Sequence, residues 1–224
     1  MTVGAVIVAA GSSTRMGGAD KLLADAGGRP VIAHAIAPFA AHEGIDALAV
    51  VASEANIDAI RAVAGEFPAT KVVAGGRRRR DSVLNGLEAL GDCDIVVVHD
   101  GARPLVTREL IDAALDGAVE AGAALCAVPV TDTVKRSGVS GLVQGTLSRE
   151  GLWLAQTPQA FRVDVLRRAH AANDIDATDD AALVELNEEP VKLVAGSREN
   201  IKITTPEDLR LVEALLAARG YTAL

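Results

Sequence analysis

The sequence predicts an α/β protein with a mostly parallel sheet and helices on both faces, and three observations carry this prediction. Residues 3–9 form a run of small and β-branched apolar residues, which is typical of a strand buried on both sides. Strand-like and helix-like segments then alternate, as in parallel sheets with right-handed crossovers. Half of the residues are apolar but only 2% are aromatic, which fits Val-rich strands under Ala- and Leu-rich helices. A chain of 224 residues suits one domain, which we expect to span residues 1–224.

The first half of the chain keeps this alternation. Pro30 suits the first turn of a helix, and Asp81 or Ser82 is a candidate N-cap for a helix that ends near Leu90. The predicted elements are helices at 30–41, 57–64 and 81–90 and strands at 48–52, 71–74 and 95–98.

The second half continues with a candidate cap at Thr107. Thr178, Asp179 and Asp180 precede another helix, and we expect the two acids to serve mainly as its N-cap and its favourable first-turn charge. The predicted elements are helices at 108–121, 163–173 and 206–219 and strands at 123–130, 191–194 and 200–204. In the last strand, Lys202 points opposite to Ile201 and Ile203, and therefore toward solvent or a crevice.

Residues 131–154 break the alternation. They show no helical periodicity and contain two short β-like pieces around Gly138 and Gly141. We interpret them as a β-arm that projects from the sheet. A two-stranded arm is only marginally stable in water, so this one needs a partner or remains a flexible excursion.

The charge and cysteine content narrow the class of protein. The net charge of −8 argues against a nucleic-acid surface, although a local cation cluster would still suit a nucleotide. Cys93 and Cys126 lack metal-site spacing and suggest a reducing compartment. The start of the chain lacks a basic region before its apolar run, and no apolar run approaches the length of a membrane span. We therefore expect a cytoplasmic protein that does not associate with membranes.

A loop of small residues follows the first predicted strand, and two cations, Arg15 and Lys21, follow the loop. Such a loop can turn its backbone N–H groups onto an anion, while arginine and lysine neutralise phosphate oxygens. Neither the Walker A frame nor the G-x-G-x-x-G fingerprint fits, since Ser13 occupies the place of the second glycine of the fingerprint. The loop is either a different triphosphate site or a plain corner with two solvated cations.

Two further motifs end at the same predicted edge of the sheet. Residues 75–83, GGRRRRDSV, offer a glycine pair and four arginines, which suit either a second wall of an anion site or a solvated basic loop. Asp100, after the strand at 95–98, can position a hydrated Mg²⁺ or orient Arg103. His99 is more consistent with a structural role, because phosphoryl-type transfer needs mainly positioning and charge neutralisation.

Together these motifs resemble the 2-C-methyl-D-erythritol 4-phosphate cytidylyltransferase family. The resemblance rests on A-A-G with R-M and K at 9–21, G-G with D-S-V at 75–83, H-D with A-R-P at 99–104, T-P-Q at 157–159 and N-I-K-I-T at 200–204. It implies a Rossmann-like, glycosyltransferase-A-like nucleotidyltransferase fold. It also implies transfer of a cytidylyl group from CTP to the polyol phosphate, with release of pyrophosphate and with Mg²⁺ carried mainly by the CTP phosphates.

The resemblance also assigns roles to residues. The implied catalytic residues are Arg15, Lys21 and Lys202; the implied nucleotide-binding residues are Ala9, Ala10, Gly11, Gly76, Arg79, Ser82 and Asp100; and the implied acceptor-binding residues are Asp100, Arg103, Thr133, Arg149 and Lys202. Thr133 and Arg149 lie in the arm, which the resemblance hooks over a second subunit to give a homodimer. Asp100 remains a candidate for the metal, the ribose or Arg103, and the roles of Arg77, Arg78 and Arg80 stay open.

Other functions remain open at this point. One alternative is a related transferase that uses ribitol 5-phosphate as acceptor. A molybdopterin-type guanylyl or cytidylyl transferase stays open because of Gly17, while a non-catalytic nucleotide-binding regulator is disfavoured by Arg15, Lys21 and Lys202 together. A dinucleotide-dependent oxidoreductase is the weakest option because of Ser13.

Overall fold

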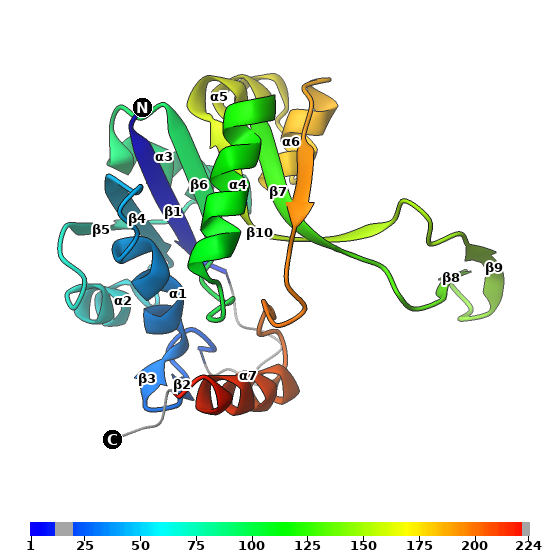
Figure 1. Ribbon diagram of the computed structural model, residues 1–224, viewed down its shortest axis with the longest axis horizontal. Helices are drawn as coiled ribbons and strands as arrows, with labels where there is room; N and C mark the ends of the chain where they lie inside the picture. The colour runs from blue at the N-terminus through cyan, green and yellow to red at the C-terminus, as the bar shows by residue number, and fades with distance from the viewer. Residues whose placement is uncertain (12–19, 221–224) are drawn as a thin grey trace.

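A seven-stranded sheet forms the centre of the molecule. The structure, a computed structural model, describes residues 1–11 and 20–220. Its strands run in the order β11-β7-β10-β6-β1-β4-β5 (Figure 1). Their bounds are β1 Val3–Ala9, β4 Ala47–Ala52, β5 Thr70–Ala74, β6 Ile95–Asp100, β7 Ala123–Pro129, β10 Trp153–Arg162 and β11 Lys192–Ala195. The predicted α/β class with a mostly parallel sheet is confirmed.

Strand β10 is the exception to the parallel arrangement. It runs antiparallel to both β6 and β7, and its register against β7 shifts between Ala155 and Gln159. We did not predict a strand here, because Pro158 lies in its middle and proline is rare inside a strand except at a bulge. The irregularity sits at that proline, which explains how a central strand tolerates it.

Helices cover both faces of the sheet, as predicted. On one face, α1 (Val31–Ala40), α2 (Ile57–Ala64) and α4 (Arg108–Ala121) pack on strand residues such as Ala5 and Ile7. On the other face, α3 (Arg79–Leu90), α5 (Val163–Ala172) and α6 (Asp180–Leu186) pack on residues such as Val6. Neighbouring residues of β1 point to opposite faces and are buried on both, so the strand is a continuous apolar run.

A separate small core lies beyond the carboxyl ends of the strands. Helix α7 (Pro206–Ala218) packs there through Val212 and Leu216 against Val31 and Leu105. A small hairpin of β2 (Asp25–Ala26) and β3 (Arg29–Pro30) lies beside it. Among residues 1–11 and 20–220, no helix is long and apolar enough to cross a membrane.

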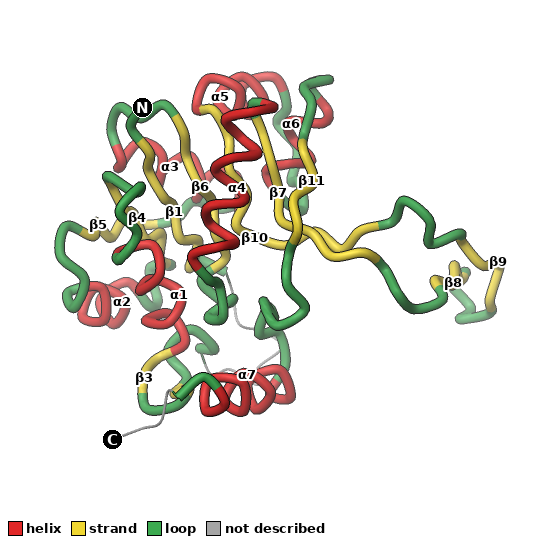
Figure 2. Tube along the Cα trace, viewed as in Figure 1, coloured by secondary structure: helices red, strands yellow, loops and turns green. Residues whose placement is uncertain are grey.

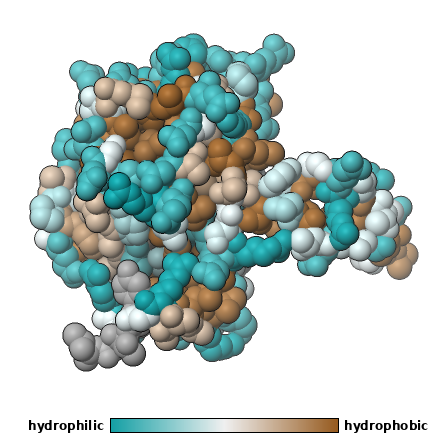
Figure 3. Space-filling view, in the orientation of Figure 1, coloured by the Kyte–Doolittle hydropathy of each residue, from teal (hydrophilic) through white to brown (hydrophobic). Residues whose placement is uncertain are grey.

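The arm projects from the body as predicted for residues 131–154. Strands β8 (Val134–Ser137) and β9 (Val143–Leu147) pair only with each other in an antiparallel sheet of their own. In Figure 2 the chain that follows β7 and the chain that precedes β10 run outward together to this tip. Apolar residues lie exposed on it, among them Val139, Leu142 and Val143. Figure 3 shows apolar surface along the arm and at its base.

Three predicted boundaries were wrong. Pro30 is the N-cap of α1 and not its first residue. Helix α3 begins at Arg79, and Asp81 lies in its first turn, where its carboxylate accepts a hydrogen bond from the backbone N–H of Arg78 at 3.1 Å.

The segment at 200–204 is the third difference, because it belongs to no strand. The backbone N–H of Ile203 instead donates to the carbonyl of Ala102 at 2.8 Å, so the segment crosses the carboxyl edge of the sheet. Ile203 is fully buried and Lys202 is exposed, as the predicted alternation required.

Candidate active site

A cavity of about 450 Å³ opens at the carboxyl ends of β1 and β6. It lies between the start of α3 and the segment that contains Lys202. Its lining consists of small residues and cations: Val8, Ala9, Ala10, Gly11, Lys21, Leu22, Gly76, Arg77, Arg78, Arg79, Ser82, Asp100, Ala102 and Lys202. Most of the predicted site residues that the structure describes thus come together here, although they are drawn from segments far apart in the sequence.

Lys21 lines this cavity, hereafter the larger cavity, and is held by a segment across the sheet edge. Its Nζ donates a hydrogen bond to the carbonyl of Ile203 at 2.9 Å. The preceding Asp20 is held as well, since its carboxylate accepts from Asn56 Nδ2 at 2.7 Å and from Leu22 N at 3.0 Å. The predicted partner cation Arg15, with Ser13 and Gly17, lies outside the described residues. Lys21 therefore contributes a positive charge to the cavity with its position already set.

The glycine pair at 75–76 is required by packing within the chain. A Cβ on Gly75 would lie 2.5 Å from the Cβ of Ala10, and one on Gly76 would lie 2.3 Å from the Cβ of Asp81. The N–H of Gly76 donates to Ser82 Oγ at 3.1 Å. The glycines therefore allow this segment to approach helix α3 closely, and the Gly76 backbone lies in the cavity wall.

A cluster of opposite charges surrounds Asp100. Its Oδ2 lies 2.9 Å from Lys202 Nζ and 3.6 Å from Arg103 Nε, and its Oδ1 lies 3.7 Å from Arg79 Nη2. Burial opposes ionisation of this carboxyl, but the charges of Lys202, Arg79 and Arg103 outweigh it and hold the pKa of Asp100 well below its usual range. Asp100 is therefore an anion around which three cations gather.

The backbone around Asp100 is fixed by a chain of hydrogen bonds through His99 and Thr157. The N–H of Asp100 donates to Thr157 Oγ1, and the Thr157 hydroxyl can then donate to His99 Nδ1, with both distances at 3.0 Å. That assignment leaves Nε2–H of His99 to donate to the carbonyl of Arg103 at 3.1 Å. Burial lowers the pKa of His99 to about 4, so the ring is neutral. These contacts support the structural role expected for His99.

A smaller hollow of about 190 Å³ adjoins the larger cavity. Arg79, Asp100 and Lys202 line both. Arg103 lines only the smaller hollow, where its Nη1 donates to the carbonyl of Asn200 at 2.7 Å. The other lining residues are Ala155, Gln156, Thr157, Gln159, Thr178 and Asp179. Sequence reasoning assigned these residues no binding role, although T-P-Q and T-D-D stood out as motifs.

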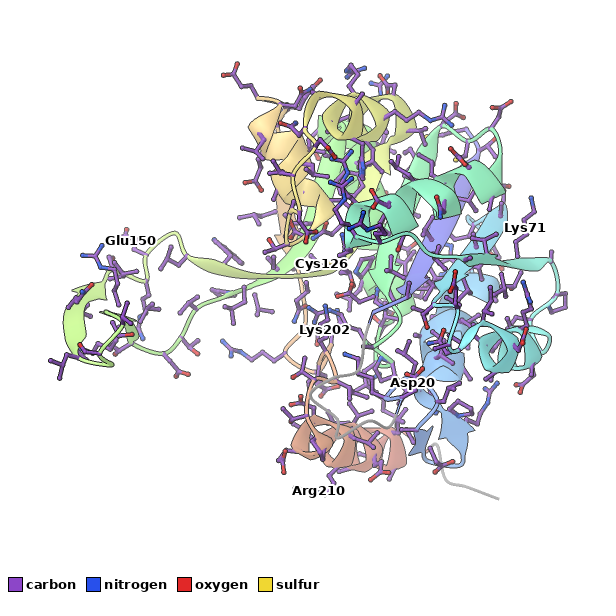
Figure 4. The ribbon with its side chains drawn as sticks, turned by 180° about the vertical axis from the view of Figure 1, so that it is seen from behind. Asp20, Lys71, Cys126, Glu150, Lys202 and Arg210 are labelled. Carbon is purple, nitrogen blue, oxygen red and sulfur yellow. The ribbon has the colours of Figure 1, made fainter. Side chains whose placement is uncertain are left out.

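The two predicted site residues of the arm lie apart from both spaces. Neither Thr133 nor Arg149 lines either of them. Arg149 Nη1 donates instead to the carbonyl of Thr131, within the arm. In Figure 4 Lys202 lies below the sheet, while Glu150, the neighbour of Arg149, is far out on the arm. Within one chain, therefore, the arm does not complete the site.

Two of the four consecutive arginines, Arg78 and Arg80, pair with groups around the start of α3 and the end of α5. Arg78 pairs with Asp81 at 2.9 Å and with Asp174 at 2.7 Å. Arg80 is buried, and its guanidinium donates to the carbonyl of His170 at 2.7 Å and to that of Asn173. Arg80 thereby satisfies carbonyls at the C-terminal end of α5, a role that neither the anion-site nor the solvated-loop interpretation anticipated.

Metal ligands are sparse in the described part of the chain. Residues 1–11 and 20–220 contain no group of three or more His, Cys, Asp and Glu side chains arranged to hold a metal ion. Asp100 lines both spaces, but its oxygens already face Lys202, Arg103 and Arg79. The donor set therefore fits a cation that arrives with phosphate oxygens better than one held by the protein alone.

The fold and the cavity define the general class of protein. A mostly parallel sheet that presents a small-residue loop and several cations at this edge is suited to binding a nucleoside triphosphate beside a second anionic reactant. The fold and site are those of a nucleotidyltransferase.

Comparison with known proteins identifies the family. The model of the 2-C-methyl-D-erythritol 4-phosphate cytidylyltransferase family matches residues 3–218, and the chain belongs to this family. A cytidylyltransferase of that name from Dehalococcoides mccartyi is 50% identical over 217 residues, which cover 96% of each chain.

Solved structures agree with this assignment. The 4-diphosphocytidyl-2C-methyl-D-erythritol synthase of Anaerococcus prevotii superposes with a TM-score of 0.84 at 30% identity, covering 96% of this chain and 98% of that one. The 2-C-methyl-D-erythritol 4-phosphate cytidylyltransferase of Thermus thermophilus gives 0.79 at 34% identity, covering 97% and 100%. The predicted fold family is confirmed.

Proposed function

We propose that this chain transfers the cytidylyl group of CTP to 2-C-methyl-D-erythritol 4-phosphate, forming 4-diphosphocytidyl-2-C-methyl-D-erythritol and pyrophosphate for isoprenoid precursor synthesis. Family membership supports the reaction. The structural observation that supports the reaction most directly is the pair of adjoining spaces, which share Arg79, Asp100 and Lys202. The larger cavity suits the nucleotide, and the smaller hollow suits the acceptor phosphate, so the two meet at the shared charges.

The chemistry needs charge control more than a nucleophile. An oxygen of the acceptor phosphate attacks the α-phosphorus of CTP, a new P–O bond forms, and the bond to the β-phosphate breaks as pyrophosphate leaves. The two anions repel each other, and fixed cations lower that cost. Lys21 serves the triphosphate and the leaving pyrophosphate, together with Arg15. Lys202 and Arg103, oriented by Asp100, serve the attacking phosphate.

The small-residue walls serve the nucleoside. Ala9, Ala10 and Gly11 line the cavity on one side, and Gly76 and Ser82 line it on the other. Small side chains allow backbone N–H and C=O groups to reach the edge of a base, where they distinguish cytosine from other bases. This supports their assignment to nucleotide binding. Arg79 joins this group at the phosphate end.

We assign the metal to the substrate. Mg²⁺ carried by the triphosphate oxygens of CTP would screen their charge in the larger cavity. Asp100 then serves Lys202 and Arg103 and not the metal, because its oxygens are already surrounded by cations. The free thiols of Cys93 and Cys126 support a reducing, cytoplasmic setting for the reaction.

We further propose a homodimer that forms through the arm at 131–154. The arm exposes Val139, Leu142 and Val143, and such apolar surface favours burial against a partner. In this arrangement Thr133 and Arg149 bind the acceptor phosphate in the smaller hollow of the other subunit. The position of both residues outside the spaces of their own chain supports the exchange.

Pyrophosphate release tests the reaction directly. The purified chain with Mg²⁺ is given CTP, UTP, ATP or GTP, each with methylerythritol phosphate or ribitol 5-phosphate. We expect release only with CTP and methylerythritol phosphate. Release with ribitol 5-phosphate would reassign the acceptor, while release with GTP would overturn the choice of nucleotide. Silence with every pair, in a protein that still binds CTP, would favour the non-catalytic regulator.

A further inference from the structure

Asp180 is a buried acid to which the mechanism above gives no role. Its side chain is fully buried at the start of α6, where a charge needs close partners. Its Oδ2 accepts a hydrogen bond from Arg79 Nη1 at 2.5 Å, and its Oδ1 lies 3.2 Å from His170 Nε2. Burial opposes ionisation, but Arg79 and His170 outweigh it and keep the pKa of Asp180 below its usual value.

Helix capping does not account for Asp180. The structure confirms the predicted acids at the start of the helix, with Asp179 as N-cap and Asp180 in the first turn, but the carboxylate of Asp180 has a further partner. Asp179 is the N-cap, and its carboxylate accepts from the N–H of Ala182 at 3.0 Å. Asp180 turns instead toward Arg79, which lies 101 positions earlier in the chain.

The Asp180 contact leaves one end of Arg79 uncommitted at the reactive junction. Arg79 lines both the larger cavity and the smaller hollow. Its Nη1 is taken by Asp180, whereas no hydrogen-bond partner reaches its buried Nη2 among the described residues. Nη2 lies 3.7 Å from Asp100, which is beyond hydrogen-bond distance. A buried, unsatisfied guanidinium N–H at this place is suited to a phosphate oxygen.

Asp180 also protects the charge balance around Asp100. Without its anchor, the Arg79 guanidinium could close the 3.7 Å gap to Asp100. It would then share the Asp100 carboxylate with Lys202, pairing with Oδ1 while Lys202 Nζ lies 2.9 Å from Oδ2. The anchor therefore keeps Arg79 and Lys202 as two separate cations at the junction.

We propose that Asp180 is a positioning residue for the transfer reaction. Asp180 holds Arg79 at the junction of the two spaces so that Arg79 Nη2 binds a phosphate oxygen of a reactant. His170 in turn contacts the other carboxylate oxygen of Asp180. This inference rests on the proposed function, because the reactant phosphates are those of CTP and the acceptor.

The chain offers a matched pair of variants for the test. Asp180→Asn keeps the shape of the side chain and removes its charge. Asp174→Asn makes the same change on the connection that leads from α5 to α6, but Asp174 pairs with Arg78 and Arg80, not with Arg79. We expect Asp180→Asn to lower kcat/KM for CTP by about tenfold or more. Asp174→Asn should stay within about twofold of the parent chain.

A double-mutant cycle separates positioning from general stability. If Asp180 acts through Arg79, then Asp180→Asn should change kcat/KM by less than about twofold in an Arg79→Gln background. An equally large loss in both backgrounds would overturn the proposal, as would an Asp180→Asn chain with parental kcat/KM. Thermal unfolding of each variant shows whether the protein assayed is folded.

Binding of inorganic pyrophosphate keeps the proposal testable apart from the reaction. If the parent chain releases no pyrophosphate with any substrate pair, the proposed function fails. Calorimetry with pyrophosphate alone then decides the role of Asp180. We expect about tenfold weaker binding for Asp180→Asn and unchanged binding for Asp174→Asn. Equal affinity in both variants would overturn the positioning role.

Discussion

The edge of the sheet and the arm contribute to the same proposed site, but they are built in opposite ways. At the edge, Asp100 is buried and its carboxylate faces three cations that come from different segments of the chain. On the arm, Arg149 is exposed and contacts the carbonyl of Thr131 nearby in the sequence. The body therefore fixes its charges before any ligand arrives, whereas the arm needs a second surface to fix its own.

This difference predicts different consequences of mutation in the two regions. A charge removed from the edge is lost from a site that is already organised, so the damage stays within the same chain. A charge removed from the arm should damage the site of a partner. The three predictions below test this contrast, and the largest effect comes first.

Lys21→Ala should produce the largest effect. Lys21 lines the larger cavity with its Nζ held by the carbonyl of Ile203, so its loss removes one fixed cation from the charge that develops on the triphosphate. We expect turnover to fall by about 10²-fold or more, measured as pyrophosphate release at saturating CTP.

Lys71 provides the matched control. Its Nζ also donates to a backbone carbonyl, that of Ala89 at 2.8 Å, but it lies away from both spaces (Figure 4). Lys71→Ala should leave turnover within about twofold of the parent chain. Near-normal turnover in folded Lys21→Ala would remove Lys21 from the mechanism.

Much of the edge could be predicted from the sequence because its residues follow buried strands. The apolar run of β1 and that of β6 place Gly11 and Asp100 at one edge, since parallel strands end together. The orientation of Lys202 also followed from alternation about Ile203, even though its segment joins no ladder. In these cases a local pattern set the position of the side chain.

Long-range partners could not be predicted in this way. Asp180 and Arg79 are joined only when β10 enters the sheet antiparallel between β6 and β7, and Pro158 concealed that strand. Arg80 likewise satisfies the end of α5 from a helix far earlier in the chain. No periodicity in a single sequence indicates which buried acid meets which arginine.

A smaller effect is expected in the pH dependence of stability. Burial lowers the pKa of His99 to about 4 in the folded chain, against about 6.5 in the unfolded chain. Below pH 6.5 the unfolded state therefore binds a proton at His99 that the folded state does not bind. The contribution of His99 to the unfolding free energy is fully present above pH 6.5 and is lost as the pH drops toward 4. Between pH 7 and pH 5 this amounts to about 2 kcal/mol of unfolding free energy.

Replacing the imidazole isolates that contribution. The His99→Gln variant cannot take up the proton, so it should lose about 2 kcal/mol less than the parent chain over the same pH interval. Urea unfolding at pH 7, 6 and 5 measures the difference, and it also corrects for any uniform destabilisation by the substitution. If the unfolding free energies of the parent chain and of His99→Gln changed equally with pH, His99 would not be a buried neutral group in the folded chain. Such a result would weaken the contrast between an edge that is organised within one chain and an arm that needs a second surface.

The last prediction concerns the arm, and its signal is a partial recovery of activity. Arg149→Ala removes a cation from the arm, and Lys202→Ala removes one from the edge, so each variant alone should be inactive. In a mixed dimer, the intact edge of the first chain meets the intact arm of the second, which restores one site of two. Random exchange makes half of the dimers mixed, so activity should recover to about a quarter of the parental value.

Arg136→Ala, on the same arm but outside the predicted site, should be active by itself. Exchange is verified with two affinity tags. Proven mixed dimers without recovered activity would show that Arg149 does not act across the interface, and the arm would then be an assembly element alone.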